Sequence, residues 1–140
     1  MAYNVRDSYL ENHVLGATPL ELVSILYQEA TKSIREAIRQ LEHGDIRGRS
    51  RAVTRAQLIL AELANSLDME AGGDIARNLS DLYGYMQSRL VEANLAQSSS
   101  MLGEVLRLLT ILEDGWKQCA QSERGTDAER NEYREVAQAL

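Results

Sequence analysis

Apolar residues recur along most of the chain at alternating steps of three and four positions, the spacing of one face of an α-helix. Four segments with this pattern follow one another, each about 20 to 25 residues long and joined by short connections. The four apolar stripes are Leu20, Val23, Tyr27, Ala30, Ile34, Ala37 and Leu41; Ile46, Val53, Leu60, Leu63 and Leu67; Ile75, Leu79, Leu82, Met86 and Ala93; and Leu102, Val105, Leu109, Leu112, Trp116 and Cys119. This arrangement predicts an all-α protein, an antiparallel up-down four-helix bundle.

Local signals mark the ends of the predicted helices. The sequence TPLE at residues 18–21 has a threonine N-cap, a proline at the first helical position and a glutamate at the third, which together form a capping box. Gly44 is expected to end the first helix, and Asp45 is expected to cap the second. The Gly-Gly pair at 72–73 interrupts the second segment, and Asp74 is expected to cap the third helix.

The two ends of the chain differ from its middle, so three parts are predicted. Residues 1–17 contain scattered apolar residues without a capped helical frame, and we expect a mobile N-terminal arm or short helix. Residues 18–120 form the bundle. Residues 121–140 are a polar, acidic tail in which a weak helix is possible, because apolar residues recur with helical spacing at Tyr133, Val136, Ala137 and Leu140.

Composition agrees with a helical fold and narrows the classes of function. The 140-residue chain has one proline and no phenylalanine, and good helix formers dominate. A chain of this length buries about 68% of its unfolded surface on folding, enough for a core without metal or disulfides. The formal net charge of −6 disfavours nucleic-acid binding, because phosphate groups repel an acidic surface.

The sequence also indicates a compartment. The single Cys119 cannot form an internal disulfide, which is typical of a reducing compartment. No apolar run approaches the roughly 18 residues of a membrane-spanning helix. The N-terminal sequence MAYNVRDSYLENH lacks the apolar stretch of a signal peptide. We therefore expect a cytoplasmic protein that does not insert into membranes.

The titratable residues give little support to catalysis. Neither His13 nor His43 stands in the Glu-x-x-His spacing of a carboxylate di-iron bundle, and His43 precedes a helix stop, unlike the mid-helix histidine of a phosphotransfer domain. Cys119 continues an apolar stripe one turn after Trp116, so we expect a small core residue. The Gly72–Gly73 pair precedes no Lys-Ser/Thr pair of a phosphate loop. The chain is expected to be no enzyme and to need no metal or cofactor.

One basic cluster stands out. Arg47, Arg51 and Arg55 follow at i, i+4 and i+8 and share a helix face, with Arg49 nearby. This face is either simply solvated or a docking stripe for an acidic protein partner, since arginine binds carboxylates in a bidentate way. A nucleic-acid partner is the least favoured of the three alternatives. Such sites usually have aromatic residues on which bases stack, and none lies among these arginines.

The last two helices carry more apolar residues than a bundle core requires. The extra residues are Leu106, Leu108 and Ile111 in the fourth helix and Tyr85, Val91 and Leu95 in the third. They either thicken the core or form a groove for an amphipathic helix of a partner. Tyr83 and Tyr85 lie about 200° apart around a helix, so both cannot face one core. We expect Tyr83 to point inward or to the helix boundary and Tyr85 outward, with Gly84 allowing a partner backbone to approach closely.

Three motifs give the chain a family resemblance. ATPLELVSILYQEA (17–30), NLSDLYGYMQSRLVEAN (78–94) and EVLRLLTILEDGWK (104–117) occur in order within a bundle of this length, and Tyr9 and Val14 fit the same pattern in the arm. The chain thus resembles FliS, the flagellar export chaperone, over roughly residues 3 to 118. Gly84 departs from the polar or acidic helix former usual in that family, and the tail beyond Ala120 has no counterpart.

The resemblance implies a binding protein that works without ATP. Such chaperones bind the C-terminal segment of flagellin, which becomes helical in apolar grooves, and thereby prevent premature polymerisation and deliver it to the type III export apparatus. The client-binding residues expected here are Tyr9, Leu10, Tyr27, Tyr83, Tyr85, Val91, Leu95, Leu106, Leu108 and Ile111. The arm either covers this groove in the free protein or is an ordinary frayed terminus.

Other partners and alternatives stay open at this point. The arginine stripe is a candidate surface for a second partner, such as the cytoplasmic domain of the export gate or a flagellar regulator. The free chain is expected to be a monomer or a dimer. The alternative function is a helical adaptor of another secretion or signalling system, which would share the grooves but bind a different client.

Overall fold

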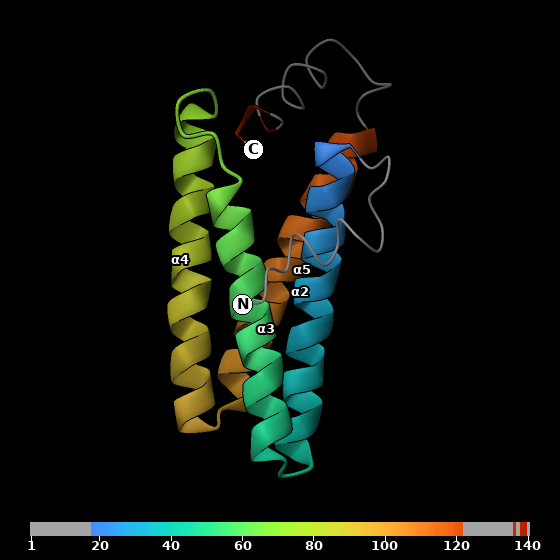
Figure 1. The fold of residues 1–140 in the computed structure, drawn as a ribbon, viewed down its shortest axis with the longest axis vertical. Coiled ribbons are helices and arrows are strands. Elements are labelled where there is room, and N and C mark those ends of the chain that lie inside the picture. Colours follow the sequence, from blue (N-terminus) through green and yellow to red (C-terminus); the bar gives the residue numbers. More distant parts are fainter. Residues whose placement is uncertain (1–17, 122–135, 137, 140) are drawn as a thin grey trace, which may run out of the picture.

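The computed structural model describes residues 18–121, 136, 138 and 139. Within these residues the chain forms four helices: α2 (Pro19–Glu42), α3 (Ile46–Asn65), α4 (Gly73–Ala96) and α5 (Ser99–Gln121). They run alternately in opposite directions, and each packs on its neighbours in the order α2, α3, α4, α5, with α5 returning to α2 (Figure 1). The predicted all-α antiparallel bundle is confirmed. The N-terminal arm and most of the tail lie outside the described residues.

The sequence signals at the first two helix starts are confirmed. The Thr18 hydroxyl accepts a hydrogen bond from the Glu21 amide, and the Glu21 carboxylate accepts one from the Thr18 amide, so the capping box is complete. Gly44 takes a positive φ of 72° after α2. Asp45 then caps α3 by accepting a 2.9 Å hydrogen bond from the Gly48 amide. These signals are local, which is why the sequence alone places them correctly.

The predicted start of α4 is wrong. Gly72 is the N-cap and receives no side-chain cap within the described part of the chain, while Asp74 lies in the first turn and pairs with Arg77. The preceding helix also ends earlier than the Gly-Gly pair suggests, because α3 stops at Asn65. The connection from Ser66 to Gly72 is therefore a structured turn rather than a helix end.

The core lies along the axis of the bundle and is built from the predicted stripes. Its fully buried members include the largest apolar side chains of all four helices: Leu26, Ile34, Ile59, Leu60, Leu63, Tyr83, Met86, Leu90, Leu102, Val105 and Leu109. Three stripe residues lie outside the core: Ile46, Ile75 and Cys119. Ile46 is 60% exposed, because it is the first residue of α3, at the end of the bundle. Ile75 and Cys119 are only half-buried, because they line a pocket.

Candidate functional site

The two tyrosines of α4 occupy opposite environments, as their spacing predicts. Tyr83 has no accessible surface, whereas Tyr85 is 47% exposed. Gly84 between them is exposed, and a methyl group added there would meet no atom within 4 Å. The helix therefore presents a bare stretch of backbone to solvent beside an exposed aromatic ring.

The inward tyrosine takes part in a polar contact at the centre of the core. Its hydroxyl lies 2.5 Å from the hydroxyl of Tyr27 on α2, and the Tyr27 ring also packs on Trp116 of α5 at a centroid distance of 6.3 Å. Burial raises the pKa of Tyr27 to about 12 although the Tyr83 hydrogen bond lowers it. Burial, together with Tyr27, raises the pKa of Tyr83 still further. Both hydroxyls therefore stay neutral at physiological pH, and the pair joins α2 to α4.

The outward tyrosine belongs to a polar network between α4 and α5. The Tyr85 hydroxyl donates to the Glu104 carboxylate. Arg89 donates to the same carboxylate at 3.2 and 3.3 Å and to Glu92 at 3.1 Å. The Tyr85 hydrogen bond, with Arg89 nearby, holds the pKa of Glu104 below its ordinary value, and the same bond raises the pKa of Tyr85. This network joins α4 and α5 about one quarter of the way along α5 from its start.

Three exposed aliphatic residues lie on the same two helices as the polar network. On α4, Val91 is 48% and Leu95 78% exposed, and both lie within about 40° of Gly84 around the helix axis. On α5, Ile111 is 67% exposed and follows Glu104 at i+7, so it lies on the same side of the helix. We call the exposed residues Tyr85, Val91, Leu95 and Ile111 together the α4–α5 face. It runs from the end of α4 towards the middle of α5.

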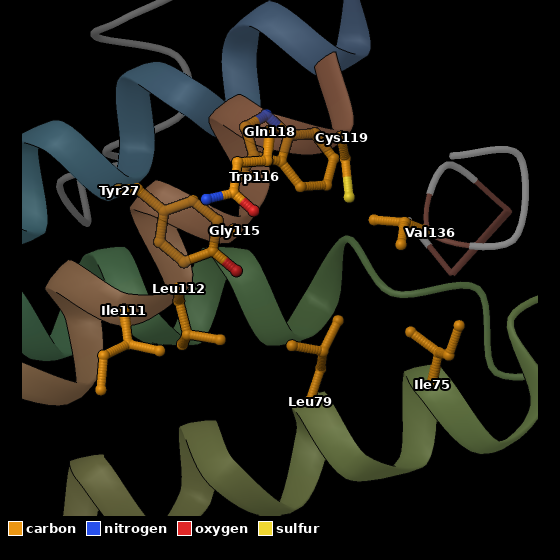
Figure 2. A pocket seen from close by; sticks show the side chains of 10 residues that line it. All are labelled: Tyr27, Ile75, Leu79, Ile111, Leu112, Gly115, Trp116, Gln118, Cys119 and Val136. Atoms are coloured by element: carbon orange, nitrogen blue, oxygen red, sulfur yellow. The ribbon is translucent and has the colours of Figure 1, made fainter. Parts of the chain in front are cut away.

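The α4–α5 face continues into a pocket of about 510 Å³. The pocket lies between the first half of α4 and the second half of α5, and its deepest part reaches Tyr27 and Trp116 (Figure 2). Ile111 belongs both to the face and to the pocket. The remaining lining residues are Ile75, Leu79, Leu112, Gly115, Gln118, Cys119 and Val136. Carbon atoms make up most of this lining, and none of the described residues that line the pocket is charged.

The other predicted client-binding residues are distributed differently. Tyr27 and Tyr83 are core residues, although Tyr27 forms the floor of the pocket. Leu106 and Leu108 are half-buried and pack against the core, so they thicken it more than they extend the face. Tyr9 and Leu10 lie outside the described residues. The structure therefore leaves Tyr85, Val91, Leu95 and Ile111 exposed on α4 and α5.

The arginine stripe is present on α3. Arg47 and Arg51 are exposed, whereas Arg55 is half-buried and pairs with Glu29 of α2 at 3.4 Å. All three line a shallow hollow of about 720 Å³ with Ser50, Thr54 and Leu58. The surface there is basic and faces away from the core, as a docking stripe requires.

Sequence reasoning missed two features of the site. Arg49, grouped with the stripe, is instead buried, and it donates to the Asn94 side chain at 2.9 Å, joining α3 to α4. The sequence does contain a signal for this burial, because Arg49 does not belong to the i, i+4, i+8 series of Arg47, Arg51 and Arg55 and therefore lies on another side of the helix. The pocket was also missed, because it depends on how far α4 and α5 diverge.

Two classes of site are not found among the described residues. No helix in the described part of the chain is both long enough and apolar enough to cross a bilayer. Residues 18–121 with the three described tail residues also contain no cluster of histidine, cysteine and carboxylate side chains suited to a metal ion. The site is thus an apolar surface with a pocket and one polar network.

Comparison with known proteins connects this site to one family. The family model described as flagellar protein FliS matches residues 1–123. The flagellar secretion chaperone FliS of Salmonella typhimurium is 38% identical over 110 residues, which is 78% of this chain and 82% of the relative. That of Bacillus subtilis is 36% identical over 121 residues, 86% and 90% of the two chains. That of Campylobacter jejuni is 31% identical over 123 residues, 88% and 94%.

The matches span the arm and all four helices, so they include both the α4–α5 face and the arginine stripe. The relatives are named for a non-enzymatic role, which agrees with the expectation that the chain is no enzyme. The resemblance seen in the sequence motifs is thereby confirmed, and the chain belongs to the FliS family of flagellar secretion chaperones.

Proposed function

We propose that this chain is a cytoplasmic export chaperone that binds the C-terminal segment of flagellin, prevents its premature polymerisation and delivers it to the flagellar type III export apparatus. Membership of the FliS family supports the role in secretion. The observation that carries the proposal is the α4–α5 face. This chain exposes Tyr85, Val91, Leu95 and Ile111 there, and Ile111 also lines an apolar pocket.

The chemistry of this face suits an amphipathic helix as client. Three of its side chains are aliphatic, and burying them against an apolar stripe stabilises a complex by roughly 25 cal/mol per Å² of apolar surface. The client supplies its own backbone hydrogen bonds once it is helical, so the face needs few polar groups. Ordering a flexible client costs several kcal/mol, which keeps the affinity moderate and permits release at the export gate.

Tyr85 and Gly84 have distinct parts in this binding mode. The Tyr85 ring tolerates water in the free chain, because its hydroxyl donates to Glu104 while its edge remains available to a partner. Gly84 has no side chain, so a client helix can approach the α4 backbone more closely at this position than it could if alanine stood there.

The first test is calorimetric titration of the full chain with a peptide of the last forty or so residues of flagellin from the same organism, combined with circular dichroism. We expect saturable one-to-one binding with a negative heat-capacity change and a gain of helix. Folded, soluble components that show no heat and no gain of helix would contradict the proposal.

A matched pair of variants tests the place of binding. Ile111→Ser removes an exposed isoleucine of the α4–α5 face, and Ile46→Ser removes an exposed isoleucine at the start of α3. We expect the first to weaken peptide binding about tenfold, as losing a buried side chain of this size does, and the second to leave it unchanged. Equal effects of the two variants would place the client elsewhere.

The alternative is a helical adaptor of another secretion or signalling system. Such an adaptor uses the same face, so the choice of client distinguishes the two functions. Binding confined to the C-terminal segment of flagellin supports the chaperone. Equal binding of unrelated amphipathic peptides supports the adaptor.

A further inference from the structure

The end of the tail returns to the bundle. The carbonyl of Ala139 accepts a 2.7 Å hydrogen bond from the Asp68 amide in the turn between α3 and α4, and Ala139 has no accessible surface. Figure 1 shows these last described residues beside that turn, between the pair α3 and α4 and the pair α2 and α5. We call Val136 and Ala139 the tail contact.

The turn is built to receive this contact. Gly72 is buried, and a Cβ atom added to it would lie 2.3 Å from the Cα of Ala139, far inside van der Waals distance. Gly72 is also the N-cap of α4, where serine, threonine, asparagine or aspartate would cap the helix better. The Asp68 side chain accepts hydrogen bonds from the Glu70 and Ala71 amides, which fixes the turn beneath the tail.

The tail contact reaches the pocket of the α4–α5 face. Val136 lines that pocket together with Ile75 of α4 and Cys119 of α5, and Figure 2 shows it on the side of these two residues. Its carbonyl accepts a 3.1 Å hydrogen bond from the Ala139 amide, so one turn of the tail links the pocket to the α3–α4 turn. The Val136 side chain therefore forms one side of the pocket in the free chain.

We propose that the tail contact is an internal occupant of the pocket and competes with the client for it. This inference rests on the proposed function, because it concerns the same α4–α5 face. The occupant is identified by the structure itself: Val136 offers an apolar side chain to an apolar pocket, and Ala139 anchors it. A bound client helix that inserts a side chain into the pocket displaces Val136.

The contact belongs to this chain rather than to the matched family region, which ends at residue 123. Two small side chains bury little surface, so the tail binds weakly and yields to a client. Being tethered to the bundle, it nevertheless re-occupies the pocket whenever the client leaves. The tail contact then covers apolar surface in the free chaperone. It lowers the apparent affinity for flagellin in proportion to the fraction of molecules in which the tail is docked.

The first arm of the test needs no client. Cys119 is the single cysteine of the chain and lines the pocket beside Val136, so its rate of reaction with a thiol reagent reports occupation. Ala139→Glu places a charge against buried Gly72, while Gln138→Glu adds the same charge at the exposed neighbouring residue. In full-length protein we expect Ala139→Glu to speed the reaction several-fold and Gln138→Glu to leave it at the parental rate. Equal rates in the parent and Ala139→Glu overturn the docking.

The second arm measures flagellin peptide binding by the same three proteins. We expect Ala139→Glu to bind the peptide about threefold to tenfold more tightly than the parent, because more molecules have an undocked tail and can bind it. Gln138→Glu should match the parent. A faster thiol reaction with unchanged affinity would overturn the competition. Absence of peptide binding in all three proteins refutes the proposed function and the competition together, whereas the thiol rates still decide whether the tail docks.

Discussion

The two halves of the bundle share one core but expose different outer faces. The outer surface of α2 and α3 is charged, with Lys32, Arg35, Arg39, Arg47 and Arg51 exposed. The outer surface of α4 and α5 has the apolar residues of the α4–α5 face. The inner stripes of all four helices contribute buried apolar residues to one core. The inner stripes therefore determine stability, and the outer faces determine which partners the bundle meets.

The same contrast occurs within three residues of α4. Tyr83 joins the helices through the Tyr27 hydroxyl, while Tyr85 faces solvent and bonds only across the surface. Changes on the inner side should alter unfolding, and changes on the outer side should alter binding. Variants that mix the two effects would break this division.

The largest expected effect comes from adjacent residues of α4. Leu90 is fully buried and Val91 is 48% exposed. Leu90→Ala should lower the free energy of unfolding by about 2–5 kcal/mol, because it leaves a cavity. Val91→Ala should change it by no more than about 0.5 kcal/mol and instead weaken peptide binding. Urea unfolding followed by Trp116 fluorescence measures both, and a comparable loss of stability in Val91→Ala would show that the outer side is structural.

The second prediction concerns the tyrosine pair at high pH. Tyr27 and Tyr83 have raised pKa values when folded, so their stabilising effect is complete below pH 10, the ordinary tyrosine value, and is lost as pH rises towards 12. Each should lower the free energy of unfolding by about 1.4 kcal/mol per pH unit within that window. The double variant with Tyr27→Phe and Tyr83→Phe should be nearly as stable as the parent at pH 7, because both partners are removed.

Urea unfolding at intervals from pH 8 to pH 12 tests this prediction, with Tyr85→Phe as the control. The control should keep the alkaline loss of stability, and the double variant should show much less of it. An unchanged alkaline slope in the double variant would mean that other groups cause the loss.

These contrasts show which parts of the molecule the sequence predicts. The capping box at Thr18, the Asp45 cap and the inward position of Tyr83 depend on residues a few positions apart, and all three are confirmed. The Asp74 cap is wrong, because Gly72 takes that position. Ala139, far along the sequence, lies against Gly72, and no local pattern around Asp74 indicates that contact.

The surface was predicted less completely than the core. Four outward residues of α4 and α5 are exposed as their helical positions indicate, namely Tyr85, Val91, Leu95 and Ile111. The pocket depends on the divergence of two helices, and the position of Arg49 depends on Asn94 across the bundle. A repeating apolar pattern describes a helix face but not the distance to its neighbour, so neither feature follows from it.

The third prediction concerns Gly84, where one substitution should stabilise the fold and weaken peptide binding, both by smaller amounts. Gly84→Ala should raise the free energy of unfolding by about 1 kcal/mol, since alanine is the better helix former and open space surrounds the position. The added methyl group should weaken flagellin peptide binding several-fold if the client backbone lies against Gly84. Gly103→Ala on α5 is the matched control, because its added atom meets only the Arg107 side chain at 3.6 Å. Unchanged binding by Gly84→Ala would place the client away from this stretch.

The smallest effect on client binding is expected on the charged half. Arg47 and Arg51 are exposed on α3, so their combined replacement by glutamate should change the free energy of unfolding by about 0.5 kcal/mol or less. Flagellin peptide binding should stay within about twofold of the parent at physiological salt, since charges beyond a Debye length are screened. An acidic second partner depends on the same arginines through bidentate hydrogen bonds.

Titration with the purified cytoplasmic domain of the export gate tests the arginine stripe directly. If that domain presents carboxylates to the stripe, the double charge reversal should abolish binding, and added salt should weaken binding of the parent. Tyr85→Ala serves as the opposite control, because it should weaken the peptide and spare the domain. If the charge reversal affected the peptide as strongly as the domain, the two halves of the bundle would form one continuous binding surface.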